Sequence, residues 1–316
     1  MRIAVLDDWA GVARDHADWD ALGEVTIFTD PIPAGDLAAT LAPFEAVCVM
    51  RERTALTAGL IAALPRLRLI VTTGPRNAAI DVAAAKARGI TVSTTRSRKT
   101  TTSELTLAMI LHQMRGLGRE AARFSAGGFQ GAPGRDMADL RVGLIGLGTV
   151  GTQVATLARA FGAQVAAWSP NLTAARAAAG GVEFVPSLTD LAARSDVLSI
   201  HMVMSDRVAG LVSAEALAAL PPGALVVNTS RAGLLDRAAL FAWLERDRSA
   251  MAAIDVFEVE PPPADDPWRA AATRFGHRLL LTPHLGYATR ATWDLFYAET
   301  AEAVAAFAAG DPIRTL

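Results

Sequence analysis

Paired cysteines, a strong charge of either sign and long apolar runs are all missing from this 316-residue sequence. Its one cysteine, Cys48, cannot form a disulfide within the chain, so a reducing, cytoplasmic compartment is expected. Cys48 lies in the apolar run 46–50, which predicts a buried hydrophobic residue and not a nucleophile. The first apolar run ends at Asp7 and is too short for the core of a signal peptide. No run approaches the roughly 20 residues that span a bilayer, so no membrane segment is expected.

The charge balance argues against polyanionic partners. Lys and Arg total 30 and Asp and Glu total 32, which gives a formal net charge of −2. We therefore expect neither a nucleic acid nor a membrane surface as a partner. Hydrophobic residues make up 52% and charged residues 20% of the chain, which is typical of a globular protein and not of a disordered one. A chain of 316 residues is long enough for two domains, each with its own core.

Short apolar runs alternate with longer helical stretches in the first third of the chain. This alternation is typical of βαβ units around a parallel sheet. Gly89, just before the last of these runs, fits the end of a helix. The strands predicted here are Ile3–Leu6, Val25–Phe28, Ala46–Met50, Leu69–Val71 and Ile90–Val92.

A second alternating array follows the stretch Thr101–Phe124, whose apolar residues predict a long helical stretch. The glycine-rich segment Gly127–Gly134 predicts a surface loop, and a last helix is predicted over 288–309. The sequence therefore predicts an α/β protein with two Rossmann-like, doubly wound parallel-sheet domains. The strands predicted in the second array are Arg141–Ile145, Gln164–Trp168, Val197–Ile200, Ala224–Val227, Ala250–Ile254 and Leu279–Leu281.

A glycine fingerprint, Gly-x-Gly-x-x-Gly, follows the first strand of the second array and opens an amphipathic helical stretch. Gly146 would permit a tight turn, Gly148 a close approach to a pyrophosphate, and Gly151 close packing of the helix on the strand. The start of the helix would offer free N–H groups to the phosphates, so Thr149 and Val150 are also predicted cofactor contacts. The alternative is a glycine-rich turn without a ligand.

The residue that usually separates NAD from NADP is replaced. In NAD sites an Asp or Glu about 20 residues after the fingerprint binds the adenine ribose and disfavours a 2′-phosphate. Ser169 occupies that position here, and the nearest base after it is Arg176. The sequence therefore permits NADP without demonstrating it.

Three polar residues, Arg231, Glu260 and His284, each follow an apolar strand. Ligands of open α/β sheets bind at the carboxyl ends of the strands, where these residues are expected to lie. Reduction of a keto acid needs a cation for the carboxylate, a proton donor for the developing alkoxide and an anion that keeps the donor charged. An arginine fork, a histidine and a carboxylate can supply these functions. Taken singly, the three residues have plainer explanations: a solvated turn, a loop surface and a core histidine.

The second array resembles the D-isomer-specific 2-hydroxyacid dehydrogenases. The segments that carry the resemblance, in family order and spacing, are Gly143–Gly151, Asp196–His201, Val226–Leu235, Asp255–Pro262 and Pro283–Gly286.

The resemblance implies roles for individual residues. It makes Arg231, Glu260 and His284 the catalytic triad and places Asp255 against the nicotinamide carboxamide. For His201 a structural role is an equal alternative to a place in the site. With the fingerprint, the remaining predicted cofactor contacts are Ser169, His201, Thr229 and Ser230.

The resemblance also implies an architecture and partners. Residues 1–98 and 285–316 are expected to form a split substrate domain around an inserted NAD(P)-binding domain, residues 99–284. NAD is the cofactor expected on family grounds, with NADP as the alternative. A homodimer formed through the coenzyme domain is expected, and no metal site is.

The predicted substrate loop departs from the family pattern. Members usually have Gly-x-Gly there, with amides that hold the substrate carboxylate, whereas this chain has Gly74, Pro75 and Arg76. Proline has no N–H, and arginine adds a bulky cation. Arg51 and Arg53 follow the third strand and are expected to face the same cleft, unless they point to solvent or pair with a neighbouring glutamate. We predict substrate contacts from Arg51, Gly74, Arg76 and the triad arginine, and a bulkier or doubly anionic substrate.

The predicted function is hydride transfer between a nicotinamide cofactor and a small 2-keto or D-2-hydroxy acid. A first alternative is an NADPH-dependent glyoxylate or hydroxypyruvate reductase. A second alternative, from another class, is a dinucleotide-sensing scaffold like the related transcriptional corepressors. The complete Arg–Glu–His set argues for an enzyme, although those corepressors also retain it.

Overall fold

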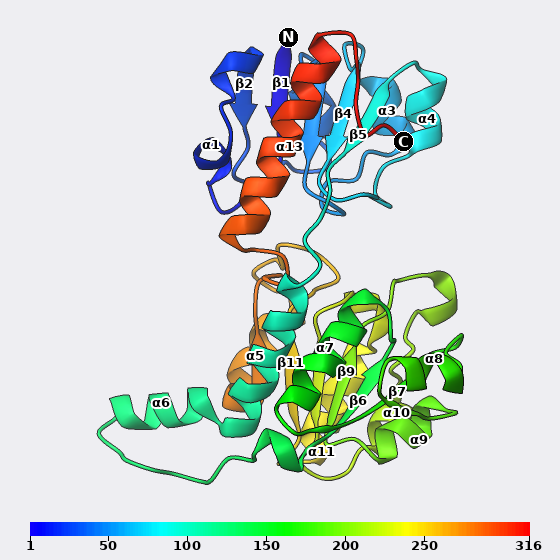
Figure 1. Ribbon diagram of the computed structural model, residues 1–316. Helices are drawn as coiled ribbons and strands as arrows, with labels where there is room; N and C mark the ends of the chain where they lie inside the picture. The colour runs from blue at the N-terminus through cyan, green and yellow to red at the C-terminus, as the bar shows by residue number, and fades with distance from the viewer. The chain divides into compact units, whose positions relative to one another are not determined.

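The computed structural model describes residues 1–316, and the chain divides into two compact units. Unit 1 consists of Met1–Arg98 and Ala288–Leu316, and unit 2 of Lys99–Tyr287 (Figure 1). Unit 1 is therefore assembled from two separate parts of the chain, and unit 2 is inserted between them. None of the helices has the length and apolar character needed to traverse a lipid bilayer.

Unit 1 is built on a five-stranded parallel sheet with the order β2-β1-β3-β4-β5. β3 and β4 are apolar or β-branched throughout and fully buried, as expected for a parallel sheet covered on both faces. The order reverses between β1 and β3, and ligands of open parallel sheets bind at such switch points. The strands are β1 (Arg2–Val5), β2 (Glu24–Ile27), β3 (Ala46–Val49), β4 (Leu69–Thr72) and β5 (Thr91–Thr94).

Helices and the last residues of the chain complete unit 1. α13 packs on β4 and β5, while residues from α2, α3 and α4 form a core with strand residues such as Val47 and Ile70. The Leu316 amide donates to the Val92 carbonyl oxygen at 2.9 Å, which extends the edge of β5. The helices are α1 (Ala13–His16), α2 (Leu37–Leu41), α3 (Ala58–Ala63), α4 (Val82–Ala87), α13 (Arg290–Ala308) and the 3-10 turn η1 (Asp20–Leu22).

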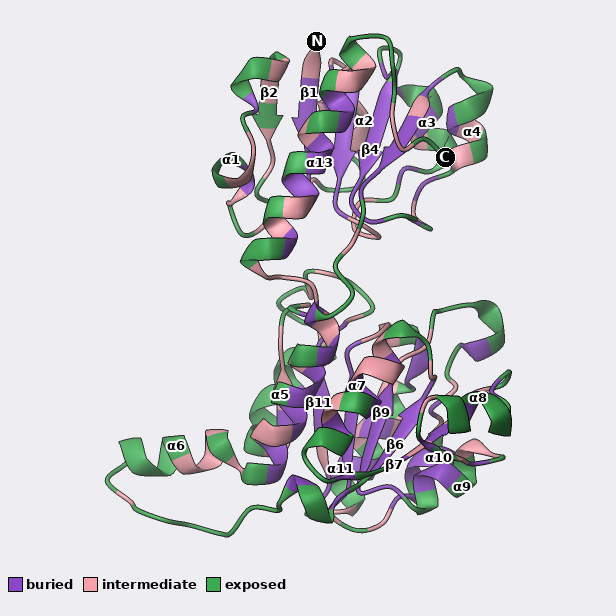
Figure 2. Ribbon diagram, viewed as in Figure 1, coloured by how far each residue is buried: buried purple, intermediate pink, exposed green.

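Unit 2 contains a seven-stranded parallel sheet with the order β12-β11-β10-β9-β6-β7-β8. The central strands are buried and carry a core on each face of the sheet (Figure 2). β8 has two residues, too few for an apolar pattern, and sequence analysis missed it. The strands are β6 (Arg141–Ile145), β7 (Gln164–Trp168), β8 (Glu183–Phe184), β9 (Val197–Ile200), β10 (Leu225–Asn228), β11 (Met251–Ile254) and β12 (Leu279–Leu281).

The helical stretch predicted over Thr101–Phe124 is present, but it is divided into two helices by a break that was not predicted. α5 (Thr101–Arg115) ends where Gly116 adopts a left-handed backbone with φ 63°, and its amide bonds back to the carbonyl oxygens of the last turn. α6 (Leu117–Ser125) then leaves in a new direction, and the glycine-rich loop predicted after it is present (Figure 1).

Six further α-helices and four 3-10 turns connect the strands of unit 2. They are α7 (Thr149–Ala160), α8 (Ala174–Ala179), α9 (Leu188–Ala193), α10 (Ala214–Ala219), α11 (Arg237–Arg246), α12 (Pro267–Phe275), η2 (Met137–Asp139), η3 (Asp206–Val208), η4 (Ala232–Leu234) and η5 (Gly276–Arg278).

Candidate active site

The carboxyl ends of three adjacent strands of unit 2 carry the residues predicted to be catalytic. β10, β11 and β12 are neighbours in the sheet and run parallel, so their carboxyl ends share one edge. Arg231 lies in the turn after β10, Asp255 and Glu260 follow β11, and His284 follows β12. Sequence positions far apart are thereby collected on the edge where parallel sheets bind ligands.

His284 and Glu260 form a direct pair. The distance between His284 Nδ1 and Glu260 Oε2 is 2.6 Å, and the side chains are 23% and 17% exposed. The other carboxylate oxygen, Oε1, accepts a bond from the Phe257 amide at 3.0 Å, which fixes the carboxylate. Nδ1 is thus engaged by the carboxylate, and Nε2 is the ring nitrogen left to exchange a proton with a ligand.

Asp255 holds the backbone that presents His284. Asp255 is fully buried, and Oδ1 accepts bonds from the Thr282 hydroxyl at 2.6 Å and the Leu285 amide at 2.7 Å. Oδ2 accepts the Gly286 amide at 2.8 Å. His284 between them has a left-handed backbone, φ 54°, which is costly for a residue with a side chain. The bonds on both sides of His284 stabilise this conformation.

The charge of Asp255 is balanced between opposing effects. Burial raises the pKa of its carboxyl group, while the Thr282 hydroxyl, the Leu285 amide and the nearby His284 oppose that rise. Thr282 and Gly286 were not singled out from the sequence. A hydroxyl residue and a glycine on either side of a histidine, directly after a strand, are the signal that could have identified them.

Hydrogen bonds within the turn after β10 hold Arg231 in place. Its Nη1 donates to the Ser230 carbonyl oxygen at 2.7 Å, and its own carbonyl oxygen accepts from Asn228 Nδ2 at 3.0 Å. Asn228 Oδ1 also accepts the Ser230 amide at 3.0 Å, so the turn is tied to the end of β10. The guanidinium is a permanently charged fork of the kind that binds carboxylates.

The glycine fingerprint forms the turn between β6 and α7. Gly146 has φ 102°, and a side chain there would strike the His201 carbonyl oxygen. A side chain on Gly151 would overlap the Gly146 carbonyl oxygen, whereas a Cβ on Gly148 would meet nothing within 4 Å. Gly146 and Gly151 are thus required by packing, and Gly148 leaves open space in front of the helix.

The start of α7 fits a pyrophosphate. The first intrahelical bond runs from the Thr152 amide to the Gly148 carbonyl oxygen at 2.9 Å, and no side chain caps the helix. The amides of Thr149, Val150 and Gly151 therefore lack partners within the helix. Free N–H groups, the positive end of the helix dipole and the open space at Gly148 suit the phosphates of a dinucleotide.

The remaining predicted cofactor residues differ in how free their side chains are. Ser169 follows β7, next to the glycine turn, and is half-buried. The Thr229 hydroxyl is buried against Thr106 at 2.8 Å, and the Ser230 hydroxyl donates to the Met202 carbonyl oxygen at 2.5 Å. The hydroxyl groups of Thr229 and Ser230 are therefore already engaged in hydrogen bonds within unit 2.

His201 lies beneath the glycine turn. Its Nε2 is 2.9 Å from the Ser199 hydroxyl, and burial lowers the pKa of the ring to about 4. The ring is therefore neutral at pH 7, which suits a packing role beside the turn better than proton transfer.

The other predicted substrate residues lie in unit 1. Arg51 follows β3, and its side chain passes over Gly74, which follows β4 and has φ 77°. Arg51 Nε is 3.4 Å from Glu52 Oε1, so the alternative of an ion pair with a neighbouring glutamate is realised for this residue. Arg53 stacks over the Trp9 ring at 3.8 Å, and Arg76 is exposed.

Comparison with known proteins identifies the family. The sequence model described as D-isomer specific 2-hydroxyacid dehydrogenase, NAD binding domain, matches residues 107–286. The chain belongs to the D-isomer-specific 2-hydroxyacid dehydrogenase family. The predicted family is thereby confirmed, and the fingerprint and the triad residues all fall within the matched NAD-binding domain.

Relatives of this family member cover it to different extents. A D-3-phosphoglycerate dehydrogenase of Mycobacterium tuberculosis is 34% identical over 282 residues, which are 88% of this chain and 52% of that protein. The chain thus spans about half the length of that relative. A hydroxypyruvate reductase of Thermotoga maritima is 31% identical over 246 residues, 77% of this chain and 78% of that protein.

A solved structure confirms the predicted fold of this dehydrogenase family member. The crystal structure of a phosphoglycerate oxidoreductase from Vibrio cholerae superposes with a TM-score of 0.90 at 32% identity. It covers 98% of this chain and 99% of that one. The two-sheet α/β architecture expected from the sequence is therefore the family architecture.

Proposed function

We propose that the protein is an NAD-dependent oxidoreductase that interconverts a 2-keto acid and the corresponding D-2-hydroxy acid. The observation that carries the proposal is the pair formed by His284 and Glu260, 2.6 Å apart, on the sheet edge that also bears Arg231. The glycine turn and the open start of α7 lie in the same unit and fit a dinucleotide.

The proposed reaction uses the triad in separate roles. In the reducing direction a keto acid, a hydride and a proton give a hydroxy acid, and bound NADH supplies the hydride. His284 donates the proton from Nε2 to the developing alkoxide, because Nδ1 is held by Glu260. The Glu260 carboxylate stabilises the positive ring before this transfer. In the oxidising direction the neutral ring takes the proton back.

Arg231 is proposed to bind and orient the substrate carboxylate. Its planar fork can form two parallel bonds, which would fix the keto carbon relative to the hydride and to His284. The Ser230 carbonyl oxygen accepts a bond from the guanidinium, and Asn228 Nδ2 donates to the Arg231 carbonyl oxygen, so the side chain and the backbone are both held before the substrate arrives. A lysine could supply the charge but not this geometry.

NAD is the proposed cofactor, with measurable use of NADP. Ser169 takes the position where an acid would repel a 2′-phosphate, so selection against NADP is weak. Arg176, the nearest base, donates to the Asn171 carbonyl oxygen at 3.3 Å and is not committed to an acidic partner. The side chains of Asp255, Thr229 and Ser230 are engaged within unit 2, so these residues are proposed to contribute to the nicotinamide end through the backbone that they position.

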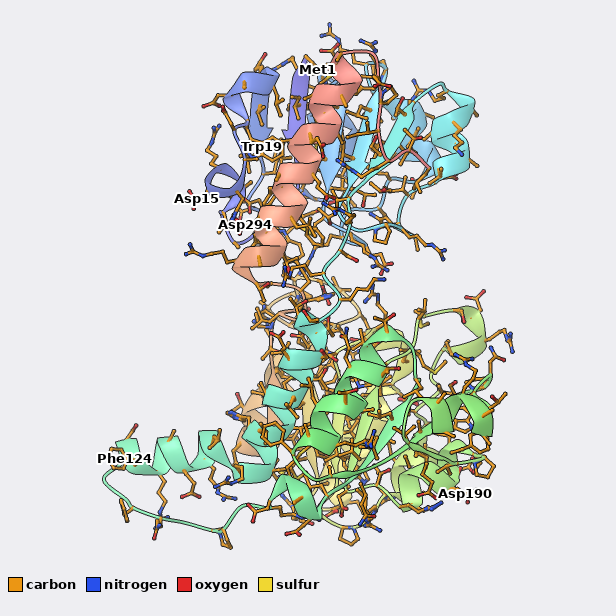
Figure 3. All side chains as sticks on the ribbon, viewed as in Figure 1. Met1, Asp15, Trp19, Phe124, Asp190 and Asp294 are labelled. Carbon is orange, nitrogen blue, oxygen red and sulfur yellow. The ribbon has the colours of Figure 1, made fainter.

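A homodimer in the cytoplasm is the proposed working form. Leu117, Phe124 and Phe129 are 53%, 69% and 73% exposed, and all belong to α6 or the loop after it. Figure 1 shows this segment extending away from the rest of unit 2, and Figure 3 shows Phe124 at its far end. Exposed aromatic residues on a projecting segment are typical of an interface. Light scattering of a Phe124→Asp, Phe129→Asp variant should report monomers where the unaltered protein forms dimers.

A panel of keto acids tests the activity. Pyruvate, glyoxylate, hydroxypyruvate and oxaloacetate are each supplied with NADH and with NADPH, and loss of the reduced nicotinamide is followed. The proposal expects turnover of at least one keto acid, and a product of D configuration wherever the product is chiral, which excludes only the glycolate formed from glyoxylate. Absence of turnover with tight binding of NADH would favour a dinucleotide-binding scaffold instead.

A further inference from the structure

A cavity of about 310 Å³ lies in unit 2, at the edge of the sheet opposite to the one that bears His284. Gly223, Ser249 and Arg278 line it, and they lie one or two residues before β10, β11 and β12, respectively. Because these strands are parallel, their amino ends share an edge that is separate from both the triad and the glycine turn. The volume lies at the lower end of the range for small-molecule sites, about 300–1,000 Å³.

The other wall of the cavity consists of the junction of α5 and α6 and of the loop after α6 (Figure 1). The Arg135 amide in that loop donates to the Met114 carbonyl oxygen in α5 at 2.8 Å. Gln113 Nε2 donates to the carbonyl oxygens of Ala252 at 3.2 Å and Arg278 at 3.3 Å. These bonds join the loop, the helix and the strands, so a ligand meets a preformed site.

Basic side chains line this cavity, and no aspartate or glutamate does. The basic residues are Arg119, Arg135, Arg248, His277 and Arg278. Two of them have carboxylate partners: Arg119 Nε is 2.8 Å from Glu120 Oε1, and Arg135 Nη2 is 3.0 Å from Asp196 Oδ1. Arg248 and Arg278 form no ion pair within the chain, so their charges are not matched by a carboxylate.

The Arg278 guanidinium is fixed in position and still has donors for a ligand. Its Nη1 donates to the carbonyl oxygens of Leu244 at 2.8 Å, Asp247 at 3.2 Å and Ala250 at 3.2 Å. The guanidinium carbon also lies 5.5 Å from the centre of the Phe275 ring. Nε and Nη2 make no bond within the chain, so both remain available to an anion.

Arg248 brings a second positive charge close to Arg278. Burial lowers the pKa of the Arg278 guanidinium, the charge of Arg248 lowers it further, and the Asp247 carboxylate opposes both effects. That carboxylate is itself engaged, because it accepts the Ser249 amide at 2.8 Å and the Gly223 amide at 3.1 Å. An anion between the two guanidinium groups would therefore replace a repulsion with charge-assisted hydrogen bonds.

Arg248 and Arg278 also line an adjacent cavity of about 300 Å³. The third arginine of that cavity, Arg274, is paired with Glu245. Of the arginines in the two cavities, the two that both cavities share are thus the ones without a carboxylate partner.

We propose that Arg248 and Arg278 form a binding site for a small polyanion that carries two or more phosphate or carboxylate groups. Arg119 and Arg135, on the other wall, can share their charge with a second anionic group of the same ligand. The ligand is neither the substrate nor the cofactor, because the site lies at the amino edge of the sheet. The proposal goes beyond the proposed function and does not depend on it.

Calorimetric titrations test the site with inorganic pyrophosphate and with citrate. Acetate, a monoanion, is the reference ligand, and the ionic strength is held constant so that screening does not differ between titrations. NADH is present at saturation, because pyrophosphate can also bind at the glycine turn. A charged hydrogen bond changes affinity by about 10-fold or more, so at least one polyanion should bind more tightly than acetate by that factor. The polyanion that shows the preference identifies the anionic group.

Matched variants assign the binding to the amino edge of the sheet. Arg248→Ala should weaken polyanion binding by about 10-fold, and Arg248→Lys should restore part of it. Arg246→Ala is the control: Arg246 is also exposed and ends α11 two residues earlier, but it lines neither cavity and should change nothing. Arg231→Ala should also leave polyanion binding unchanged, because Arg231 lies at the carboxyl edge. Melting temperatures of all variants report whether they fold.

The outcomes separate this inference from the proposed function. Unchanged binding in Arg248→Ala, or polyanions that bind no more tightly than acetate, overturns the site even if keto acids are reduced. Loss of binding in Arg231→Ala but not in Arg248→Ala would place the anion in the candidate active site and would overturn it as well. A dimer that dissociates in Arg248→Ala would assign the cavity to a subunit contact instead. If no keto acid is reduced, the proposed function fails, and the comparison of variants still decides the polyanion site.

Discussion

In each of the two sheets a buried aspartate follows one of the strands. The hydrogen bonds that the two carboxylates accept differ. Asp255 after β11 is 0% exposed and accepts three hydrogen bonds, with both oxygens engaged. Asp7 after β1 is 6% exposed and accepts a hydrogen bond from the Thr54 hydroxyl at 2.8 Å, while its Oδ2 is buried without a hydrogen-bond partner. Burial raises the pKa of both carboxyl groups.

The difference shows what a buried charge is used for. At Asp255 the bonds hold a strained histidine in position, so the cost of burial is offset and a functional side chain is fixed. At Asp7 the backbone is left-handed as well, φ 64°, but one carboxylate oxygen has no hydrogen-bond partner, and the burial of the group outweighs the opposing effects of Thr54, Arg53 and Met50 on its pKa. At the carboxyl edge of the second sheet the buried carboxylate therefore fixes the position of His284. At the switch point of the first sheet the buried carboxylate of Asp7 instead lowers the stability of the fold.

The largest expected effect is at the histidine that Asp255 supports. His284→Ala removes the proton donor and should lower kcat for keto acid reduction by about 100-fold or more. Cofactor affinity, measured by quenching of protein fluorescence, should stay nearly constant. Wild-type turnover in this variant would show that the carboxyl edge of the unit 2 sheet, which bears Asp255 and His284, is not catalytic.

Asp255→Asn should be the next most severe change. The amide replaces an acceptor with a donor that faces the Gly286 or Leu285 N–H, which leaves a buried group unsatisfied. The free energy of unfolding should fall by about 1–3 kcal/mol, and kcat should fall with it because His284 loses its support. Urea unfolding and steady-state kinetics on the same preparation measure both. A stable variant with full activity would contradict the supporting role.

Glu260→Gln should have a smaller effect than the two changes above. The amide lacks the charge of the carboxylate that is 2.6 Å from His284 Nδ1, so the proton donor is held less firmly. Near neutral pH the rate of keto acid reduction should drop by about 10-fold. An unchanged rate in steady-state assays would argue against a catalytic role for the pair.

Asp7→Asn should have the smallest effect and the opposite sign to Asp255→Asn. The folded-state pKa of Asp7 is raised above its ordinary value of 3.8, so its contribution to stability is fully present below that value and is lost as the pH rises through the folded pKa. The asparagine keeps an oxygen for Thr54 and avoids the buried charge. At pH 7 the variant should be more stable by about 1 kcal/mol, and the gain should shrink toward pH 4. Thermal melts across this range measure it, and a lower stability at pH 7 would mean that Asp7 is fully compensated.

How far sequence could predict this molecule depended on the range of the interactions. β7 was predicted with its observed bounds, because its five residues are bounded by a glycine turn and a proline. The helical stretch over Thr101–Phe124 was predicted without its break at Gly116, where one left-handed residue outweighs the apolar pattern on both sides. Propensity sums over a window and cannot register such a single break.

How much of the candidate site could be predicted also depended on the range of the interactions. Arg231, Glu260 and His284 could be singled out because each lies in the segment that follows a strand, which is a local signal. The contacts of Asp255 could not be predicted, since its donors lie 27 to 31 residues further along and meet it only in the folded sheet. The ion pair of Arg51 and the stacking of Arg53 on Trp9 depend on side-chain directions that sequence does not specify.

The split of unit 1 sets an order of assembly during synthesis. All five strands of its sheet are made within the first 98 residues, yet α13, which packs on β4 and β5, begins at Arg290. Unit 2 is contiguous, so all of its residues leave the ribosome before α13 does. The first sheet to be translated is thus the last to be covered, and its apolar face stays open to chaperones for the time taken to make the whole of the other unit.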